Sequence, residues 1–153
     1  GPTNSQSSQA RLSGYMAALQ KNGISADPHL IKVGDYVSDK AYKAACDLLE
    51  MREQDRPTAI FAFNDLGAIN VYRAARQHGI SLPEQLSIIG FDDVYPAASM
   101  CPSLTTIRQP FDLIARQCID LILEARKGKV EQNYFILPTQ LVERESCTSP
   151  ALP

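Results

Sequence analysis

The sequence has little of what a metal site or a disulfide framework requires. Its 153 residues include four cysteines and two histidines, all scattered, with no Cys-x-x-Cys pair among them. Structural zinc sites and small disulfide-bonded domains depend on regularly spaced Cys and His residues. We therefore expect no metal site, and reduced thiols in a protein of the cytoplasm.

Concentrated positive charge is also missing. The formal net charge is −2, and no run of Lys or Arg stands out. Domains that bind nucleic acid by themselves usually carry a basic face, so we expect this chain alone to bind DNA weakly or not at all. No secretory leader and no apolar run of membrane-spanning length is seen, which predicts no membrane partner.

The usual signatures of catalysis are missing too. There is no Gly-x-Ser-x-Gly elbow, no Gly-x-Gly-x-x-Gly fingerprint and no Walker A loop. Asp92 and Asp93 are adjacent, so their side chains should diverge instead of facing each other like the carboxylate pair of a glycoside hydrolase. We expect no enzymatic activity and no cofactor, which makes a small α/β enzyme the weakest interpretation.

What the chain does have is apolar spacing that switches repeatedly between helical and strand periods, over a length that suits one domain. Residues 58–63 are continuously apolar, as is typical of a strand covered on both faces. The alternation predicts an α/β fold with a doubly wound parallel sheet. The expected helices are 7–22, 39–53 (capped by Ser38), 65–79 and 111–126, and the expected strands are 30–33, 58–63, 86–90, 104–107, 134–137 and 140–142.

Polar residues follow three of the expected strands. Asn64 and Asp65 come after the second strand, Asp92 and Asp93 after the third, and Gln109 after the fourth. Such groups at the carboxyl ends of buried strands can line a ligand cleft, where a carboxylate accepts hydrogen bonds from two adjacent sugar hydroxyls. The alternative is that each pair simply caps the next helix, and for Asn64 and Asp65 in isolation capping is favoured.

Other candidate ligand contacts come from single residues. Ser7 and Arg11 are four apart on the first helix and share a face, although Arg11 could equally be solvated. Tyr36 follows the first strand, where an aromatic ring could stack on a sugar or base or be a partly exposed turn residue. Gln109 and Phe111 flank Pro110 at the start of the last helix. Phe111 could instead belong to the apolar stripe of that helix and pack in a core.

That last helix does not fit a self-contained domain. The stripe along 111–125, followed by two more strands, exceeds what a sheet built from the first half can accommodate. Each large apolar side chain left bare forfeits about 1.5–3 kcal/mol. We expect the stripe to be covered by a second lobe, another chain, domain exchange or a rearranged helix.

Four segments together resemble one protein family: residues 1–15, PTAIFAFND at 57–65, SIIGFDD at 87–93 and PSLTTIRQ at 102–109. They resemble the effector-binding core of the lactose-repressor/galactose-repressor (LacI/GalR) family of bacterial transcription regulators. The similarity runs from residue 1 to about 144. The last two segments at this spacing are the specific ones.

The resemblance implies a periplasmic-binding-protein-like type I fold of which this chain is the second half. Residues 1–107 would form the C-terminal lobe, 108–146 would cross to a first lobe that is absent here, and 147–153 would be a frayed tail. Arg11 and Asn64 would bind ligand hydroxyls, and Asp92 would take two of them. The full set of implied effector contacts is Ser7, Arg11, Tyr36, Asn64, Asp92, Gln109 and Phe111.

The function implied is that of a regulator's sensor domain. It would bind a small effector, a sugar or a nucleoside, between two lobes, while a helix-turn-helix absent from this chain binds operator DNA. Homodimers would form through the start of the 39–53 helix, residues 69–77 and residues 96–101. The alternative is the sugar-binding receptor of an ABC transporter, which shares the fold.

Overall fold

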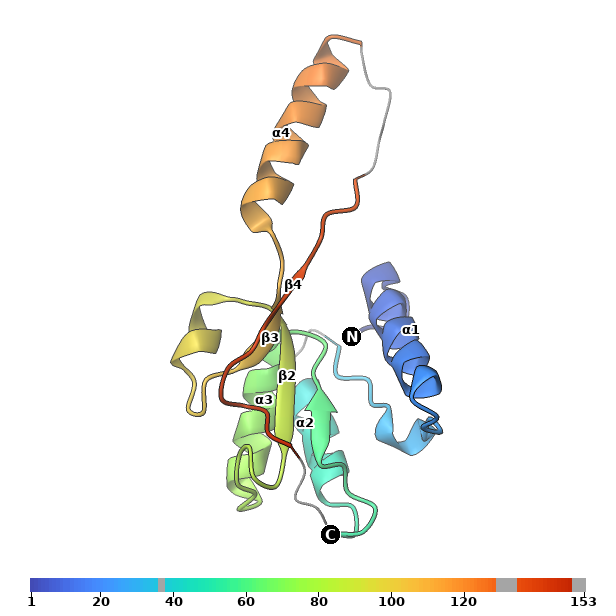
Figure 1. Cartoon of the computed structure of the whole chain (residues 1–153), viewed down its shortest axis with the longest axis vertical. Coiled ribbons are helices and arrows are strands. Elements are labelled where there is room, and N and C mark those ends of the chain that lie inside the picture. The colour runs from blue at the N-terminus through green and yellow to red at the C-terminus, as the bar shows by residue number, and fades with distance from the viewer. Residues whose placement is uncertain (36–37, 129–134, 150–153) are drawn as a thin grey trace.

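The fold was determined as a computed structural model that describes residues 1–35, 38–128 and 135–149 (Figure 1). The described elements are α1 (Gln6–Lys21), the 3-10 helix η1 (Pro28–Leu30), α2 (Ser38–Leu49), β1 (Ala59–Phe61), α3 (Asp65–Gln77), β2 (Ser87–Asp92), the 3-10 helix η2 (Tyr95–Ser99), β3 (Thr105–Arg108), α4 (Phe111–Arg126) and β4 (Gln140–Val142).

The described strands form one sheet in the order β1-β2-β3-β4. The first three strands are parallel, and β4 runs antiparallel to β3. The predicted α/β class with a mainly parallel sheet is therefore confirmed. Because the strands are parallel, the carboxyl ends of β1, β2 and β3 all open toward the same edge, where the polar residues singled out from the sequence lie.

The core lies between the sheet and α3, with α2 packed on α3. Small residues on one face of α3, namely Ala68, Ala74 and Ala75, are fully buried and let the helix approach the sheet closely. They meet Leu86 and Ile88 next to and within β2. Burial of each such leucine or isoleucine stabilises the fold by about 1.5–3 kcal/mol.

Two expectations for the early strands are wrong. Residues 30–33 form no strand, because Pro28–Leu30 is a 3-10 helix and 31–33 are irregular. The 58–63 strand is reduced to β1, and it is not covered on both faces, since Ala59 and Phe61 are exposed. β1 pairs only with β2 among the described residues, so its second edge has no strand to extend the pairing. Ala59 and Phe61 project from the same face of β1, and both line an apolar groove instead of a packed core.

This apolar groove has a volume of about 370 Å³. Its walls are α1, the 31–33 segment, α2 and β1, with Leu12, Tyr15, Val33 and Phe61 among its lining. None of the residues of α1 is fully buried. The groove thus lies between α1 and the packed half of the molecule.

The helix α4 projects away from the sheet and ends far from the core (Figure 1). Its bounds are those that the apolar stripe predicts, but none of its residues is buried, and Ile119 and Ile122 are exposed. Of the expected 134–137 strand, residue 134 lies outside the described residues, and 135–137 form no strand. The 140–142 strand is confirmed as β4.

After β4 the chain returns to the sheet and is held there. The Ser146 hydroxyl accepts from the Thr105 amide at 2.8 Å and donates to the Ile88 carbonyl at 2.5 Å. The Thr148 amide donates to the Ser87 hydroxyl at 3.1 Å, and the Cys147 thiol donates to the Ile88 carbonyl. Residues 147 and 148 of the expected tail thus have hydrogen-bond partners on β2, and 150–153 lie outside the described residues.

Candidate functional site

Three residues from distant parts of the chain meet at the carboxyl edge of the sheet. Asp92 ends β2, Gln109 follows β3, and Arg11 reaches them from α1. The Gln109 side-chain amide donates to Asp92 Oδ1 at 2.6 Å, and Arg11 Nη2 lies 4.0 Å from the same oxygen. The side chains of Arg11 and Asp92 are 17% and 22% exposed. This cluster is half-buried and combines donors with a carboxylate acceptor.

The Arg11 guanidinium is fixed between two aromatic rings. It lies 4.3 Å from the Phe63 ring centroid and 3.7 Å from that of Phe91, and Nη1 donates to the Phe63 carbonyl at 3.1 Å. Cation–π contacts of this kind contribute about 0.5–2 kcal/mol each. Sequence reasoning did not identify the two phenylalanines. The available signal was that each one immediately precedes a polar residue at a strand end.

Asp92 and Asp93 point in different directions, as their adjacency predicts. Both have left-handed backbone angles, with φ of 115° at Asp92 and 57° at Asp93. Such angles are costly for residues with a Cβ and persist where the surroundings enforce them. The result is that one carboxylate faces Arg11 and Gln109 while the other faces inward.

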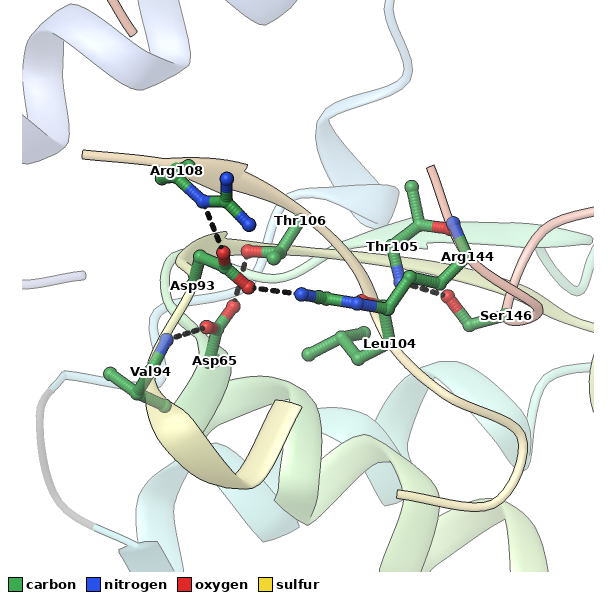
Figure 2. A network of polar contacts seen from close by, with 9 residues as sticks. All are labelled: Asp65, Asp93, Val94, Leu104, Thr105, Thr106, Arg108, Arg144 and Ser146. Atoms are coloured by element: carbon green, nitrogen blue, oxygen red, sulfur yellow. Dashed lines mark hydrogen bonds and ion pairs between the residues drawn. The ribbon is translucent and has the colours of Figure 1, made fainter. Parts of the chain in front are cut away.

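Asp93 belongs to a polar network behind the site (Figure 2). Its Oδ2 accepts from Arg108 Nε and its Oδ1 from Arg144 Nη2, both at 2.6 Å. A second carboxylate, that of Asp65, accepts from the Thr106 hydroxyl at 2.5 Å and from the Val94 amide at 2.8 Å. The two carboxylates fix both sides of the turn that follows β2.

The two carboxylates of this network have opposite pKa shifts. Burial raises the pKa of Asp65 above its usual value, although hydrogen bonds from Thr106 and Val94 counteract part of the effect. Burial also acts to raise the pKa of Asp93, but the hydrogen bonds from Arg144 and Arg108 outweigh it and lower the pKa. Asp93 is therefore ionised in the folded state at neutral pH.

The shift at Asp93 predicts an acid-dependent loss of stability. A lowered folded-state pKa stabilises the fold above the unfolded pKa of about 3.9, and this contribution is lost as pH falls through the folded-state value. Asp93→Asn should therefore lower the melting temperature clearly at pH 7, and the gap to wild type should narrow progressively as the pH falls below the unfolded pKa of about 3.9. Thermal melts followed by circular dichroism measure this gap.

The contribution of Asp65 has the opposite sign, since a raised pKa destabilises the fold as pH rises through it. Asp65→Asn is thus the matched control for the Asp93 series, and its gap to wild type should not close in acid. A gap for Asp93→Asn that stays constant from pH 7 to pH 3 would contradict the assignment of an ionised, doubly paired Asp93.

Two other polar candidates have partners of their own. The Asn64 side-chain oxygen accepts from the Gly67 amide at 2.8 Å and caps α3, while Asp65, not Asn64, is the residue that turns inward. The expected capping role of Ser38 is wrong, because Ser38 is the first residue of α2 and its hydroxyl donates to Asn70 Oδ1 instead.

Of the last three candidates, the structure describes Ser7 and Phe111 but not Tyr36. Ser7 is exposed, and its hydroxyl is 2.9 Å from that of Ser5. Phe111 is the first residue of α4 and is 51% exposed. Tyr36 lies outside the described residues.

Two further properties concern the described residues only. No group of three or more His, Cys, Asp or Glu side chains there is arranged to hold a metal ion. Within the same residues, every helix is too short or too polar to span a membrane.

Comparison with known proteins gives one family match over nearly the whole chain. The family described as "Periplasmic binding protein-like domain" matches residues 1–147. Among curated relatives, the HTH-type transcriptional regulator MalR of Clostridium butyricum is 39% identical over 137 residues, covering 90% of this chain and 40% of MalR. The HTH-type transcriptional repressor PurR of Vibrio atlanticus is 37% identical, covering 89% and 40%. The chain thus spans about two-fifths of the length of these relatives.

Solved structures agree with the family match. The transcriptional regulator CelR in complex with cellobiose has a TM-score of 0.88 and 32% identity, over 95% of this chain and 44% of CelR. A lac repressor dimer bound to operator and the anti-inducer ONPF has a TM-score of 0.84 and 30% identity, over 97% and 51%.

Proposed function

Since this chain belongs to the periplasmic binding protein-like family, as an effector-binding domain of the lactose-repressor/galactose-repressor type, we propose that it senses a small hydroxyl-rich molecule for a transcriptional repressor. The ligand class is a sugar or a nucleoside. CelR binds cellobiose, and the lac repressor dimer binds operator. Both named relatives are regulators, not enzymes, and we propose no catalytic activity.

The observation that carries the proposal is the Arg11–Asp92–Gln109 cluster. Asp92 offers a charged acceptor at the end of β2, and Gln109 and Arg11 place donors beside it. Adjacent ligand hydroxyls can donate to the carboxylate and accept from the guanidinium and the amide. The separation of 4.0 Å between Arg11 and Asp92 is longer than a hydrogen bond, which leaves room for a hydroxyl to bridge them.

The remaining candidates stay part of the proposal as peripheral contacts. Ser7, Tyr36, Asn64 and Phe111 would approach the ligand from around the cluster. Asn64 is the weakest of them, because its side-chain oxygen is engaged as the α3 cap.

The second lobe is also part of the proposal. Residues 1–107 would be one lobe, and α4 with the strand region up to 146 would cross to the other. The exposed apolar stripe of α4, with Phe111 and Ile122 among its bare residues, supports this division because it has no cover within the described chain. A ligand that prefers one lobe arrangement would shift the equilibrium between two, and only this differential affinity can transmit a signal.

The proposed partners lie outside this chain. Operator DNA would be bound by a helix-turn-helix of the whole protein in the cytoplasm, and a homodimer would position two such heads on a two-fold site. The dimer surface would include the start of α2, residues 69–77 and residues 96–101. Only the outward face of α3 is available for it, because Val71, Ala74 and Ala75 pack into the core.

A ligand screen on the whole gene product tests the proposal. Cellobiose, maltose, cytidine and inosine are each added in a thermal-shift assay, and we expect at least one to raise the melting temperature by several degrees. Fluorescence anisotropy then measures whether that compound changes binding to DNA from upstream of the protein's own gene. Ligand binding without any DNA binding would favour the transport receptor instead, and the absence of both would reject the proposal.

A further inference from the structure

We propose that Arg144 is a positioning residue for the effector site: it anchors Asp93 and thereby holds Asp92 in its strained, ligand-facing conformation. The inference rests on the proposed function, in which Asp92 receives the ligand hydroxyls. Arg144 itself would touch no ligand. It acts from behind the turn that follows β2.

The conformation of Asp92 needs an external cause. Asp92 and Asp93 are consecutive non-glycine residues with left-handed φ, and each such residue costs free energy that the surroundings must supply. At Asp92 itself, the carboxylate accepts from the Gln109 side-chain amide at 2.6 Å and faces Arg11 at 4.0 Å. Its backbone is the last position of the β2–β3 pairing, and its carbonyl accepts from the Gln109 backbone amide at 3.5 Å. The stronger restraints act on the next two residues.

Arg144 supplies the more buried of the two arginine bonds to Asp93 (Figure 2). Its side chain is 16% exposed, and Nη2 donates to Asp93 Oδ1 at 2.6 Å while Nη1 donates to the Leu104 carbonyl at 2.7 Å. Its backbone amide donates to the Thr105 hydroxyl at 2.9 Å. One residue therefore joins the turn after β2 to the start of β3, and charge-assisted bonds of this geometry are the stronger kind.

The other restraints on the turn are weaker or lie on its far side. Arg108 also binds Asp93, but its side chain is 51% exposed, so water competes for it. Asp65 holds the Val94 amide and fixes the chain after the two strained residues. If Arg144 is removed, the carboxylate of Asp93 keeps one solvated partner, and the pair of left-handed residues can relax toward extended angles.

The test compares Arg144→Met with Ser146→Ala in the whole gene product. Ser146 anchors the same returning segment through Thr105 and Ile88 but makes no bond to Asp93. Both variants should lower the melting temperature. Only Arg144→Met should also weaken binding of the probe, cellobiose or cytidine, by about tenfold to a hundredfold, as release of the strained turn implies. Isothermal titration calorimetry gives these dissociation constants.

A second readout needs no ligand. The one-bond Cα–Hα coupling of Asp92 in an NMR spectrum reports the sign of φ, and it should shift in Arg144→Met but not in Ser146→Ala. Arg144→Lys keeps one donor, so its Asp92 coupling and its affinity for the probe should lie between those of wild type and Arg144→Met. This variant serves as the test if Arg144→Met does not fold. An unchanged coupling and an unchanged dissociation constant in the arginine variants would overturn the inference. If none of the probes binds the wild-type protein, the proposed function is rejected instead. The NMR coupling of Asp92 then still tests whether Arg144 holds this residue in its left-handed conformation.

Discussion

Asp92→Asn should weaken effector binding by about a hundredfold while the fold stays intact. Asparagine keeps the shape of aspartate and tolerates a left-handed φ, so the φ of 115° at this position adds little strain. What is lost is the negative charge that accepts from ligand hydroxyls. Hydrogen bonds to charged groups contribute about 1.5–3 kcal/mol each, and about 3 kcal/mol corresponds to a factor of roughly 100.

The choice of asparagine matters because alanine at the same position would confound the result. An alanine at this φ has no side chain to compensate for the strained backbone, so a loss of binding could come from a moved turn. The matched control is Asp47→Asn, which makes the same substitution at an exposed position on α2. Calorimetry on both variants, with melting curves alongside, separates the two effects. An affinity of Asp92→Asn within twofold of wild type would remove Asp92 from the site.

Gly90→Ala should destabilise the fold by about 2–5 kcal/mol, which corresponds to a melting temperature lower by roughly 10 °C. Gly90 lies within β2, and its Cα faces the buried carboxylate of Asp65. A Cβ built there would overlap Asp65 Oδ1 and come within 2.9 Å of Leu104 Cδ2. Asp65 cannot move away without breaking its bonds to Thr106 and Val94. The change therefore both overpacks the core and leaves buried polar groups unsatisfied.

Gly14→Ala provides the control for this prediction. Gly14 is exposed within α1, and a Cβ there meets nothing within 4 Å. The same added methyl should stabilise the helix by about 0.5–1 kcal/mol, since alanine loses less backbone entropy. Urea unfolding measured for both variants gives the two free energies. A loss of less than about 1 kcal/mol in Gly90→Ala would mean that Asp65 is not held as tightly as its contacts imply.

Sequence patterns predicted the elements that depend least on their neighbours. The bounds of α4 follow from its own apolar stripe, whether or not anything covers that stripe. Residues 30–33 have the composition of a strand but form none, since a strand exists only when a neighbour takes its backbone hydrogen bonds. The same dependence explains why β1 is shorter than its apolar run predicts.

The candidate site divides in a similar way. Arg11, Asp92 and Gln109 could be picked out because each has a local signal, at a strand end or on a helix face. Adjacent polar residues such as Asn64 and Asp65 could not be told apart, because which one turns inward depends on Gly90 and Thr106 across the sheet. Arg144 had no local sequence signal, because its partner Asp93 lies 51 positions earlier in the chain.

The absence of fully buried residues in α1 bears on how the protein opens. Regions with few buried contacts unfold locally at a lower free energy than the core, so α1 should detach well before the α3–sheet unit melts. The attachment of α1 to the sheet then depends on the stacked Arg11 side chain more than on burial of apolar side chains. A ligand that binds the Arg11 guanidinium would tie down the least protected helix, and the binding signal would begin as a local ordering of α1.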